Sequence, residues 1–234
     1  MTCGEYLMQM QEKYQIIKIL SKKNGGQILL MRHKTLEKDI VVRCYPKPIE
    51  AYNKLKNYYH PNIAVVFDSF LLDDGQIVLE EYVDGITVNE VLQSGCYKYR
   101  GAKKIITDVG NALIDLHRMN IIHRDIKPEN IIIDKNGCAK LIDFNASRLY
   151  TTKTERDTEV LGTVGYASPE QFGISQSGEK SDIYSLGVLL NVMLTGKHPS
   201  DSLAKGKAGR IVLKCTQIDP NSRFKTVEKL LMKL

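Results

Sequence analysis

The chain of 234 residues is 43% hydrophobic and 26% charged, which is the balance of a globular protein able to bury a sizeable core. This composition excludes intrinsic disorder and fibrous folds, and the length suits one domain or two small lobes. The 33 Lys and Arg against 27 Asp and Glu give a net charge of +6, but they form no dense basic tract. We therefore expect no nucleic-acid partner.

Cysteine usage and apolar runs bear on the compartment. The five cysteines are far apart and never form a CxxC pair, which predicts reduced thiols in a cytoplasmic protein. Residues 1–20 lack the apolar core of a signal peptide, and the longest apolar stretch, residues 183–194, is too short to span a bilayer. The sequence therefore predicts no membrane segment.

The first third of the chain reads as strands. Short β-branched or aliphatic runs alternate with turn residues such as Asn24-Gly25-Gly26 and Asp73-Asp74-Gly75, a pattern typical of hairpins. One helix, residues 49–58, is expected after Pro46 and Pro48. The predicted strands are residues 14–20, 27–32, 39–44, 63–70 and 76–82.

After Tyr82 helical periodicity replaces strand alternation. The expected helices are residues 87–92, 101–119, 182–194, 211–217 and 226–234. Between them, the polar segment from Tyr150 to Glu159 predicts a surface loop. The sequence therefore predicts an α+β fold with two lobes, a small β-rich lobe at residues 1–81 and a larger helical lobe at residues 82–234.

The strongest functional signal is the segment at residues 123–130, which reads HRDIKPEN. Strand-like runs follow it, and after the second comes Asp143-Phe144-Asn145, so a hairpin would bring Asp125, Asn130 and Asp143 into one small volume. Oxygen atoms of Asn130 and Asp143 suit Mg²⁺. Asp125 would then accept a proton from an incoming hydroxyl, and Lys127 would neutralise charge on a transferring phosphoryl group.

These residues resemble the catalytic loop and the metal-binding triplet of eukaryotic-type protein kinases. Residues 161–170 resemble the end of a kinase activation segment, and residues 181–187 resemble the buried helix that follows it. The resemblance implies a Ser/Thr protein kinase that uses ATP with Mg²⁺ or Mn²⁺ in a cleft between the lobes. Its partner would be a protein substrate with a Ser or Thr acceptor. Glu170 and Arg223 would form a structural ion pair.

The small lobe departs from the family pattern. Ser21 and Lys23 stand where the phosphate-binding loop has its first two glycines, and only Gly26 is kept, with Gly25 beside it. Asn145 replaces the glycine of the metal-binding triplet, although Asn tolerates left-handed backbone angles. The nucleotide contacts that the resemblance implies are Gly25, Gly26, Ile28, Val41, Arg43, Glu81, Val83 and Ile132.

A second departure concerns the cation that contacts ATP. Arg43 stands where the family has lysine, and the usual glutamate partner on the following helix falls on Ala51, next to Glu50. A buried Arg needs a carboxylate, so we expect Arg43 to pair with Glu80 or Glu50, and favour Glu80. We call the catalytic-loop and metal-binding residues the lower site (Asp125, Lys127, Asn130 and Asp143) and the nucleotide-facing residues of the small lobe the upper site (Ser21, Lys23, Arg43 and Ala51). The lower site favours an enzyme, whereas the upper site favours the alternative, a pseudokinase that serves as a binding or scaffold module.

The polar loop is the predicted regulatory segment. A phosphate on one of its threonines would pair with Arg124 and order the loop. The alternative is a solvated polar loop without a regulatory role. The candidate acceptors are Thr151, Thr152, Thr154 and Thr158.

Overall fold

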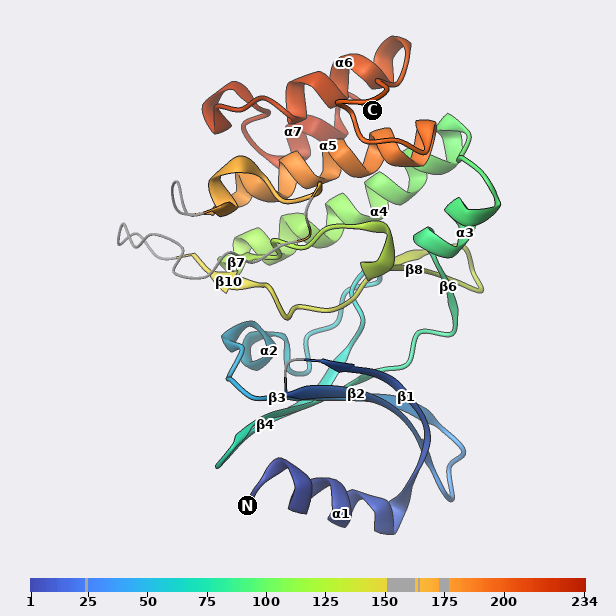
Figure 1. Ribbon diagram of the computed structural model, residues 1–234, viewed down its shortest axis with the longest axis vertical. Helices are drawn as coiled ribbons and strands as arrows, with labels where there is room; N and C mark the ends of the chain where they lie inside the picture. The colour runs from blue at the N-terminus through green and yellow to red at the C-terminus, as the bar shows by residue number, and fades with distance from the viewer. Residues whose placement is uncertain (24, 151–162, 164, 173–176) are drawn as a thin grey trace. The chain divides into compact units, whose positions relative to one another are not determined.

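The computed structural model describes residues 1–23, 25–150, 163, 165–172 and 177–234 (Figure 1). The chain forms two compact units. The N-terminal unit holds residues 1–60 and 64–83, and the C-terminal unit holds residues 61–63 and 84–234. The candidate phosphoacceptor threonines lie outside the described residues. Among the described residues, no helix is long and apolar enough to cross a membrane.

The N-terminal unit is built on a five-stranded antiparallel sheet with the strand order β1-β2-β3-β5-β4. Its strands are β1 (Tyr14–Lys23), β2 (Gly26–His33), β3 (Asp39–Tyr45), β4 (Val66–Leu72) and β5 (Gly75–Glu81). The hairpin between β4 and β5 turns at Asp73-Asp74, and at Gly75, the first residue of β5, a Cβ atom would lie 2.1 Å from the carbonyl oxygen of Tyr45. The five strands predicted from alternation are confirmed, although β1 ends three residues later than expected and β4 begins three residues later.

A helix that the sequence reading missed, α1 (Cys3–Lys13), covers one face of this sheet (Figure 1). Thr2 and Glu5 form a capping box at its start, with Thr2 Oγ1 accepting from the Glu5 amide at 3.2 Å. Leu7 packs against the apolar side chains of the sheet. These side chains are Leu29, Met31, Ile40, Val42, Cys44 and Ile77.

The second helix of this unit is shorter than predicted. It is α2 (Glu50–Leu55), whereas the sequence predicts residues 49–58. Lys56 already has extended backbone angles and bridges to Val66, and Asn57 follows with a left-handed φ of 59°. The polypeptide therefore leaves the helix to join the sheet. Ala51, Tyr52 and Leu55 form its buried side.

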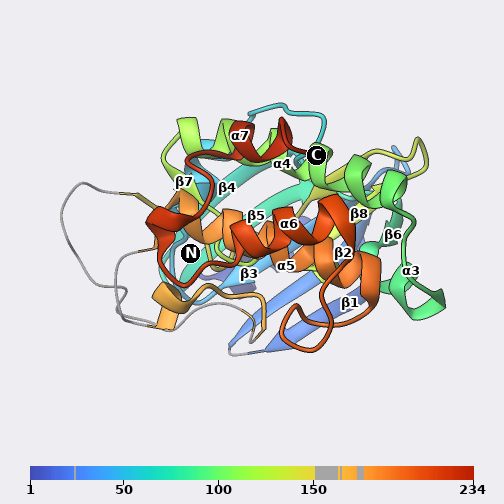
Figure 2. The ribbon, with the colours of Figure 1, turned by 90° about the horizontal axis from the view of Figure 1, so that it is seen from above.

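The C-terminal unit is mainly helical, and Figure 2 shows α6 lying over α5 with α7 nearby. Its helices are α3 (Val88–Ser94), α4 (Tyr99–Arg118), α5 (Glu179–Thr195), α6 (Gly206–Cys215) and α7 (Val227–Leu231). Helix α5 packs between α4 and α6, and α7 packs on α4. A Cβ at Gly187 would lie 2.3 Å from the Cβ of Cys215, so α5 and α6 approach closely at this glycine.

Short strands and 3-10 turns complete the C-terminal unit. The strands are β6 (Gly85–Thr87), β7 (Ile121–Ile122), β8 (Ile131–Asp134), β9 (Ala139–Leu141) and β10 (Arg148–Leu149). The 3-10 turns are η1 (Pro128–Asn130), η2 (Pro169–Phe172) and η3 (Pro220–Ser222). The hairpin of β8 and β9 is the one expected after the HRDIKPEN segment. The candidate site residues flank this hairpin, with Asp125, Lys127 and Asn130 before β8 and Asp143 after β9.

Candidate active site

Asp125 lies at the centre of a hydrogen-bonded group in the C-terminal unit. Its Oδ2 accepts from the Lys127 ammonium at 2.7 Å and from the Asn130 amide at 2.8 Å. Its Oδ1 accepts from the Thr163 hydroxyl at 2.7 Å, and Lys127 Nζ also reaches that hydroxyl at 2.7 Å. These hydrogen bonds fix the orientation of the Asp125 carboxylate. One of its oxygens already accepts a hydrogen bond from a hydroxyl group, that of Thr163.

These contacts keep the Asp125 carboxylate ionised. Burial alone would raise its pKa, but the hydrogen bonds from Lys127 and Thr163, together with the charge of Lys127, outweigh burial and lower the pKa below its ordinary value. The carboxylate can therefore act as a hydrogen-bond acceptor and a base at neutral pH.

Asn130 and Asp143 are brought together by the β8–β9 hairpin. The carbonyl oxygen of Asn130 accepts from the amide of Ile142, the residue immediately before Asp143, at 3.0 Å. The NH₂ group of Asn130 is directed to Asp125, so its amide oxygen is the atom left for a cation. One amide oxygen and one carboxylate, completed by phosphate oxygens, are a donor set that suits Mg²⁺.

The left-handed backbone that the sequence suggested for Asn145 lies two residues earlier in the triplet, at Asp143. Asp143 itself has a left-handed φ of 64°, and its Oδ1 accepts from the Asn145 amide at 3.3 Å. Phe144 is fully buried and packs edge-on against His123, with ring centroids 5.1 Å apart. The polypeptide direction at Asp143 is thus set by a local turn on one side and by core packing on the other.

Two anchors of the catalytic loop were not found from the sequence. Asp182, in the first turn of α5, accepts from the amides of His123 at 3.0 Å and Arg124 at 2.8 Å, and also contacts His117 Nε2 at 2.8 Å. On the other side, Gln171 Nε2 donates to the Arg124 carbonyl oxygen at 2.8 Å. Arg124 has a left-handed φ of 68°, so these bonds hold a strained turn next to Asp125.

Asp182 is fully buried, and burial would raise its pKa. The hydrogen bond and charge of His117, with the amides of the loop, outweigh burial and lower the pKa instead. The available signal was an acidic residue directly before the long, mainly apolar run at residues 183–194. Its partners lie 58 to 65 residues away in sequence, which no local pattern specifies.

The predicted ion pair of Glu170 and Arg223 is confirmed. It is bidentate, at 2.7 and 2.9 Å, and Glu170 also accepts from the Ser181 hydroxyl at 2.8 Å. Burial opposes ionisation of Glu170, but the Arg223 guanidinium holds its pKa below the usual range. The guanidinium also stacks over Tyr184, 5.0 Å from the ring centroid. The pair therefore ties η2 to η3 and to α5.

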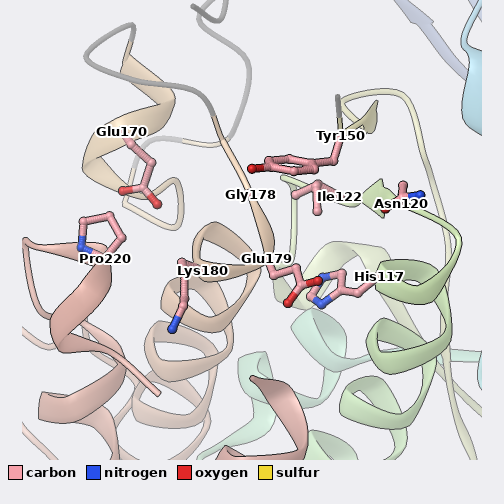
Figure 3. A pocket seen from close by; sticks show the side chains of 9 residues that line it. All are labelled: His117, Asn120, Ile122, Tyr150, Glu170, Gly178, Glu179, Lys180 and Pro220. Carbon is pink, nitrogen blue, oxygen red and sulfur yellow. The ribbon is translucent and has the colours of Figure 1, made fainter. Parts of the chain in front are cut away.

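A pocket of about 340 Å³ lies beside this ion pair (Figure 3). Figure 3 shows the Glu170 carboxylate on one wall and Tyr150 on another, with Lys180 between Pro220 and Glu179. None of Asp125, Lys127, Asn130 and Asp143 lines it. The chemistry proposed below therefore does not depend on this pocket.

The N-terminal unit contains the predicted upper-site cation. Arg43 on β3 donates through Nε to Glu80 on β5, and the two side chains are 5% and 2% exposed. Val41 pairs with Glu80 across the ladder, so Val41, Arg43 and Glu80 share the sheet face opposite α1. The predicted pairing of Arg43 with Glu80 is confirmed, and Glu50 is an exposed residue at the start of α2.

The remaining predicted nucleotide contacts are spread over both units. Gly25 turns the β1–β2 hairpin with a φ of 78°, and Gly26 begins β2. Ile28 pairs with Arg43 across the ladder and so shares its face. In the same unit, the Glu81 carboxylate accepts from the Val65 amide at 3.0 Å, and Val83 is buried.

Ile132 is the one predicted nucleotide contact in the C-terminal unit. It lies half-buried in the middle strand of the sheet β6-β8-β9, paired with Thr87 and Lys140. That strand follows Asn130 directly, so Ile132 belongs to the same hairpin as the candidate metal ligands.

Comparisons with known proteins show the family to which the chain belongs. Residues 16–232 match the family model described as protein kinase domain, and the chain belongs to the protein kinase family. It is 30% identical to the serine/threonine-protein kinase PrkC of Bacillus subtilis, over 93% of this chain and 39% of that protein. It is 32% identical to the serine/threonine-protein kinase PknB of Mycolicibacterium smegmatis, over 85% of this chain and 34% of that protein.

The chain thus spans between a third and two fifths of the length of these relatives. The family match begins at residue 16, so α1 lies outside it. The helix that covers the sheet is therefore an addition to the part of the chain that the family model describes.

Proposed function

We propose that this chain transfers the γ-phosphoryl group of ATP to Ser or Thr of a protein substrate, with Mg²⁺ or Mn²⁺ as the metal. The observation that supports this best is the Asp125 group. A carboxylate with a lowered pKa accepts from a hydroxyl at 2.7 Å, and a lysine ammonium lies 2.7 Å from both the carboxylate and that hydroxyl.

Each residue of this group has a distinct role in the proposal. Asp125 orients the substrate hydroxyl and accepts its proton as the oxygen attacks phosphorus. Lys127 places a positive charge where negative charge develops on the transferred group. Asn130 and Asp143 hold the metal ion, which neutralises charge on the ATP phosphates when it is bound.

The proposal is tested with radiolabelled ATP, Mg²⁺ or Mn²⁺, and a generic protein substrate. Wild-type protein should label the substrate on Ser or Thr, and Asp125→Asn should lower the rate by about 100-fold or more. Asp143→Asn should also stop transfer, and it should weaken nucleotide binding in the presence of metal. Undiminished labelling by Asp125→Asn would contradict the proposed enzymatic function.

A scaffold function is the second candidate, and the Arg43–Glu80 pair favours it. A guanidinium already engaged by a buried carboxylate has less of its charge available to a phosphate. Metal-dependent ATP binding distinguishes the two, because a scaffold needs no working Asp143. If the wild-type protein does not label the substrate and its ATP affinity is the same in Asp143→Asn, the scaffold function is favoured.

A further inference from the structure

The positive charge of this protein is concentrated at one end of the sequence. Residues 197–234 contain nine Lys or Arg and three Asp or Glu, a net charge of +6. Residues 1–196 contain 24 of each sign, so this last segment accounts for the whole net charge of the chain. If the positive charge served solubility alone, we would expect it to be spread along the chain and not concentrated in one segment.

Nearly all of these cations are exposed. Arg223 is buried against Glu170, and the other eight are at the surface. Within the described part of the chain, none of those eight side chains forms an ion pair with an Asp or Glu side chain. We call them the basic surface. It consists of Lys197, Lys205, Lys207, Arg210, Lys214, Lys225, Lys229 and Lys233.

Helix α6 arranges part of this surface as a stripe. Lys207, Arg210 and Lys214 are three and four residues apart, so they share one helix face. The opposite face is buried on α5, where Gly187 allows the close approach. At the end of the stripe, Lys214 and Lys225 are close enough to Lys180 to contribute, after burial, to lowering its pKa.

A pocket opens at the start of the same helix. Its volume is about 610 Å³, its apolar lining includes Leu194, Leu203 and Ala208, and Lys205 and Lys207 line it too. The Lys207 ammonium donates to the Leu234 carbonyl oxygen at 3.0 Å, which fixes the position of this cation. The pocket therefore offers an apolar floor with positive charge beside it.

We propose that the basic surface and this pocket bind an acidic segment of the protein substrate, with one apolar side chain of that segment in the pocket. Naming the partner as the substrate rests on the proposed function. The docking itself rests on charge complementarity and on the apolar floor.

A second copy of this chain does not supply the complementary charge. The N-terminal unit carries eleven Lys or Arg against ten Asp or Glu, and residues 84–196 carry thirteen against fourteen. Neither part presents the excess of carboxylates that the basic surface would need. An anionic bilayer would satisfy the charge, but it offers no single side chain that would fill a concave pocket.

The surface is remote from the proposed chemistry. Figure 1 shows α6 and α7 on the other side of α4 and α5 from β7 and β8, the strands that flank the catalytic loop. Changes in the basic surface should therefore alter the binding of acidic substrates and leave turnover of a short neutral peptide unchanged.

The first test is binding of a labelled peptide, measured by fluorescence anisotropy. The probe carries a run of glutamates and one leucine, and its matched probe has glutamine in place of each glutamate. We expect Arg210→Glu/Lys214→Glu to weaken binding of the acidic probe by about tenfold at low salt. The control Lys18→Glu/Lys38→Glu makes the same charge change on exposed side chains of the N-terminal unit and should change binding less than about twofold.

Leu203→Asp tests the pocket, since it places a carboxylate at the apolar floor and should also weaken binding. Equal binding of the two probes, or equal loss in the control variant, would overturn the proposal. Tighter binding to vesicles of phosphatidylserine and phosphatidylcholine than to the acidic probe would also overturn it, in favour of a membrane.

Kinetics separate this inference from the proposed function. With a Ser peptide that carries the acidic tail, Arg210→Glu/Lys214→Glu should raise KM by about tenfold and leave kcat unchanged. Specific binding of the acidic probe without any turnover would support the docking site and refute the proposed kinase activity. If the wild type and Arg210→Glu/Lys214→Glu turn over this peptide with the same KM, the kinase activity is supported and the docking site is refuted.

Discussion

The buried ion pair of Arg43 and Glu80 gives the sharpest prediction about stability. The two side chains are 5% and 2% exposed, so replacing either partner with an apolar residue leaves a charge that solvent cannot reach. Such a change costs about 3–5 kcal/mol. With a urea dependence of about 2 kcal/mol/M, Glu80→Leu or Arg43→Met should lower the unfolding midpoint by about 1.5–2.5 M.

The double variant Arg43→Met/Glu80→Leu provides the decisive comparison. Because neither charge remains, its stability should return to within about 1 kcal/mol of the wild type. Asp39→Asn is a matched control in the same sheet, since Asp39 accepts two hydrogen bonds from Arg32 at 2.7 and 2.9 Å in an exposed pair. This control should move the midpoint far less.

The assay is urea unfolding followed by circular dichroism, with ATP affinity measured on the same samples. Single variants no less stable than the Asp39→Asn control would refute the buried-charge reasoning. If the double variant folds and keeps wild-type ATP affinity, the role of Arg43 is to stabilise the sheet, and it contributes nothing to nucleotide binding.

Three further predictions concern the C-terminal unit. Arg223→Met should destabilise the protein by about 3–5 kcal/mol because it leaves Glu170 buried without its guanidinium; unchanged urea unfolding would contradict this. Burial lowers the pKa of His123, so below about pH 6.5 the unfolded chain binds more protons than the folded one. Stability should therefore fall with decreasing pH, by at most about 1.4 kcal/mol per pH unit, and His123→Phe should remove this slope in unfolding curves at pH 7.5 and 5.5. Asp182→Asn should lower kcat more than it raises KM, because it loosens the turn at Arg124 that positions the base; an effect on KM alone would point to substrate binding instead.

The parts of this structure that sequence reasoning predicted are those with local causes. Alternation and turn residues predicted the sheet, and helical periodicity predicted the helices of the C-terminal unit. The contact of Asp125 with Asn130 follows from a tight turn and a hairpin within a few residues. Helix α1 was missed although its capping box, Thr2 and Glu5, is visible in the sequence, because its apolar residues are mixed with Glu, Gln and Lys.

The parts that could not be predicted depend on long-range register. The sequence favoured Glu80 over Glu50 as the partner of Arg43, but the choice is made by the register of β3 and β5, in which Val41 pairs with Glu80. Likewise, Asp182 shows its role only when α5 brings it to the amides of His123 and Arg124. A one-residue shift in either place would turn a side chain to another face.

The location of the Arg43 partner has a consequence for control of the upper site. In the family pattern described above, the partner carboxylate comes from the helix after β3, so movement of that helix can break the pair. Here both partners lie on neighbouring strands joined by ladder hydrogen bonds, and α2 presents Ala51 at the equivalent position. The pair is therefore formed whenever the sheet is folded, whatever the position of α2.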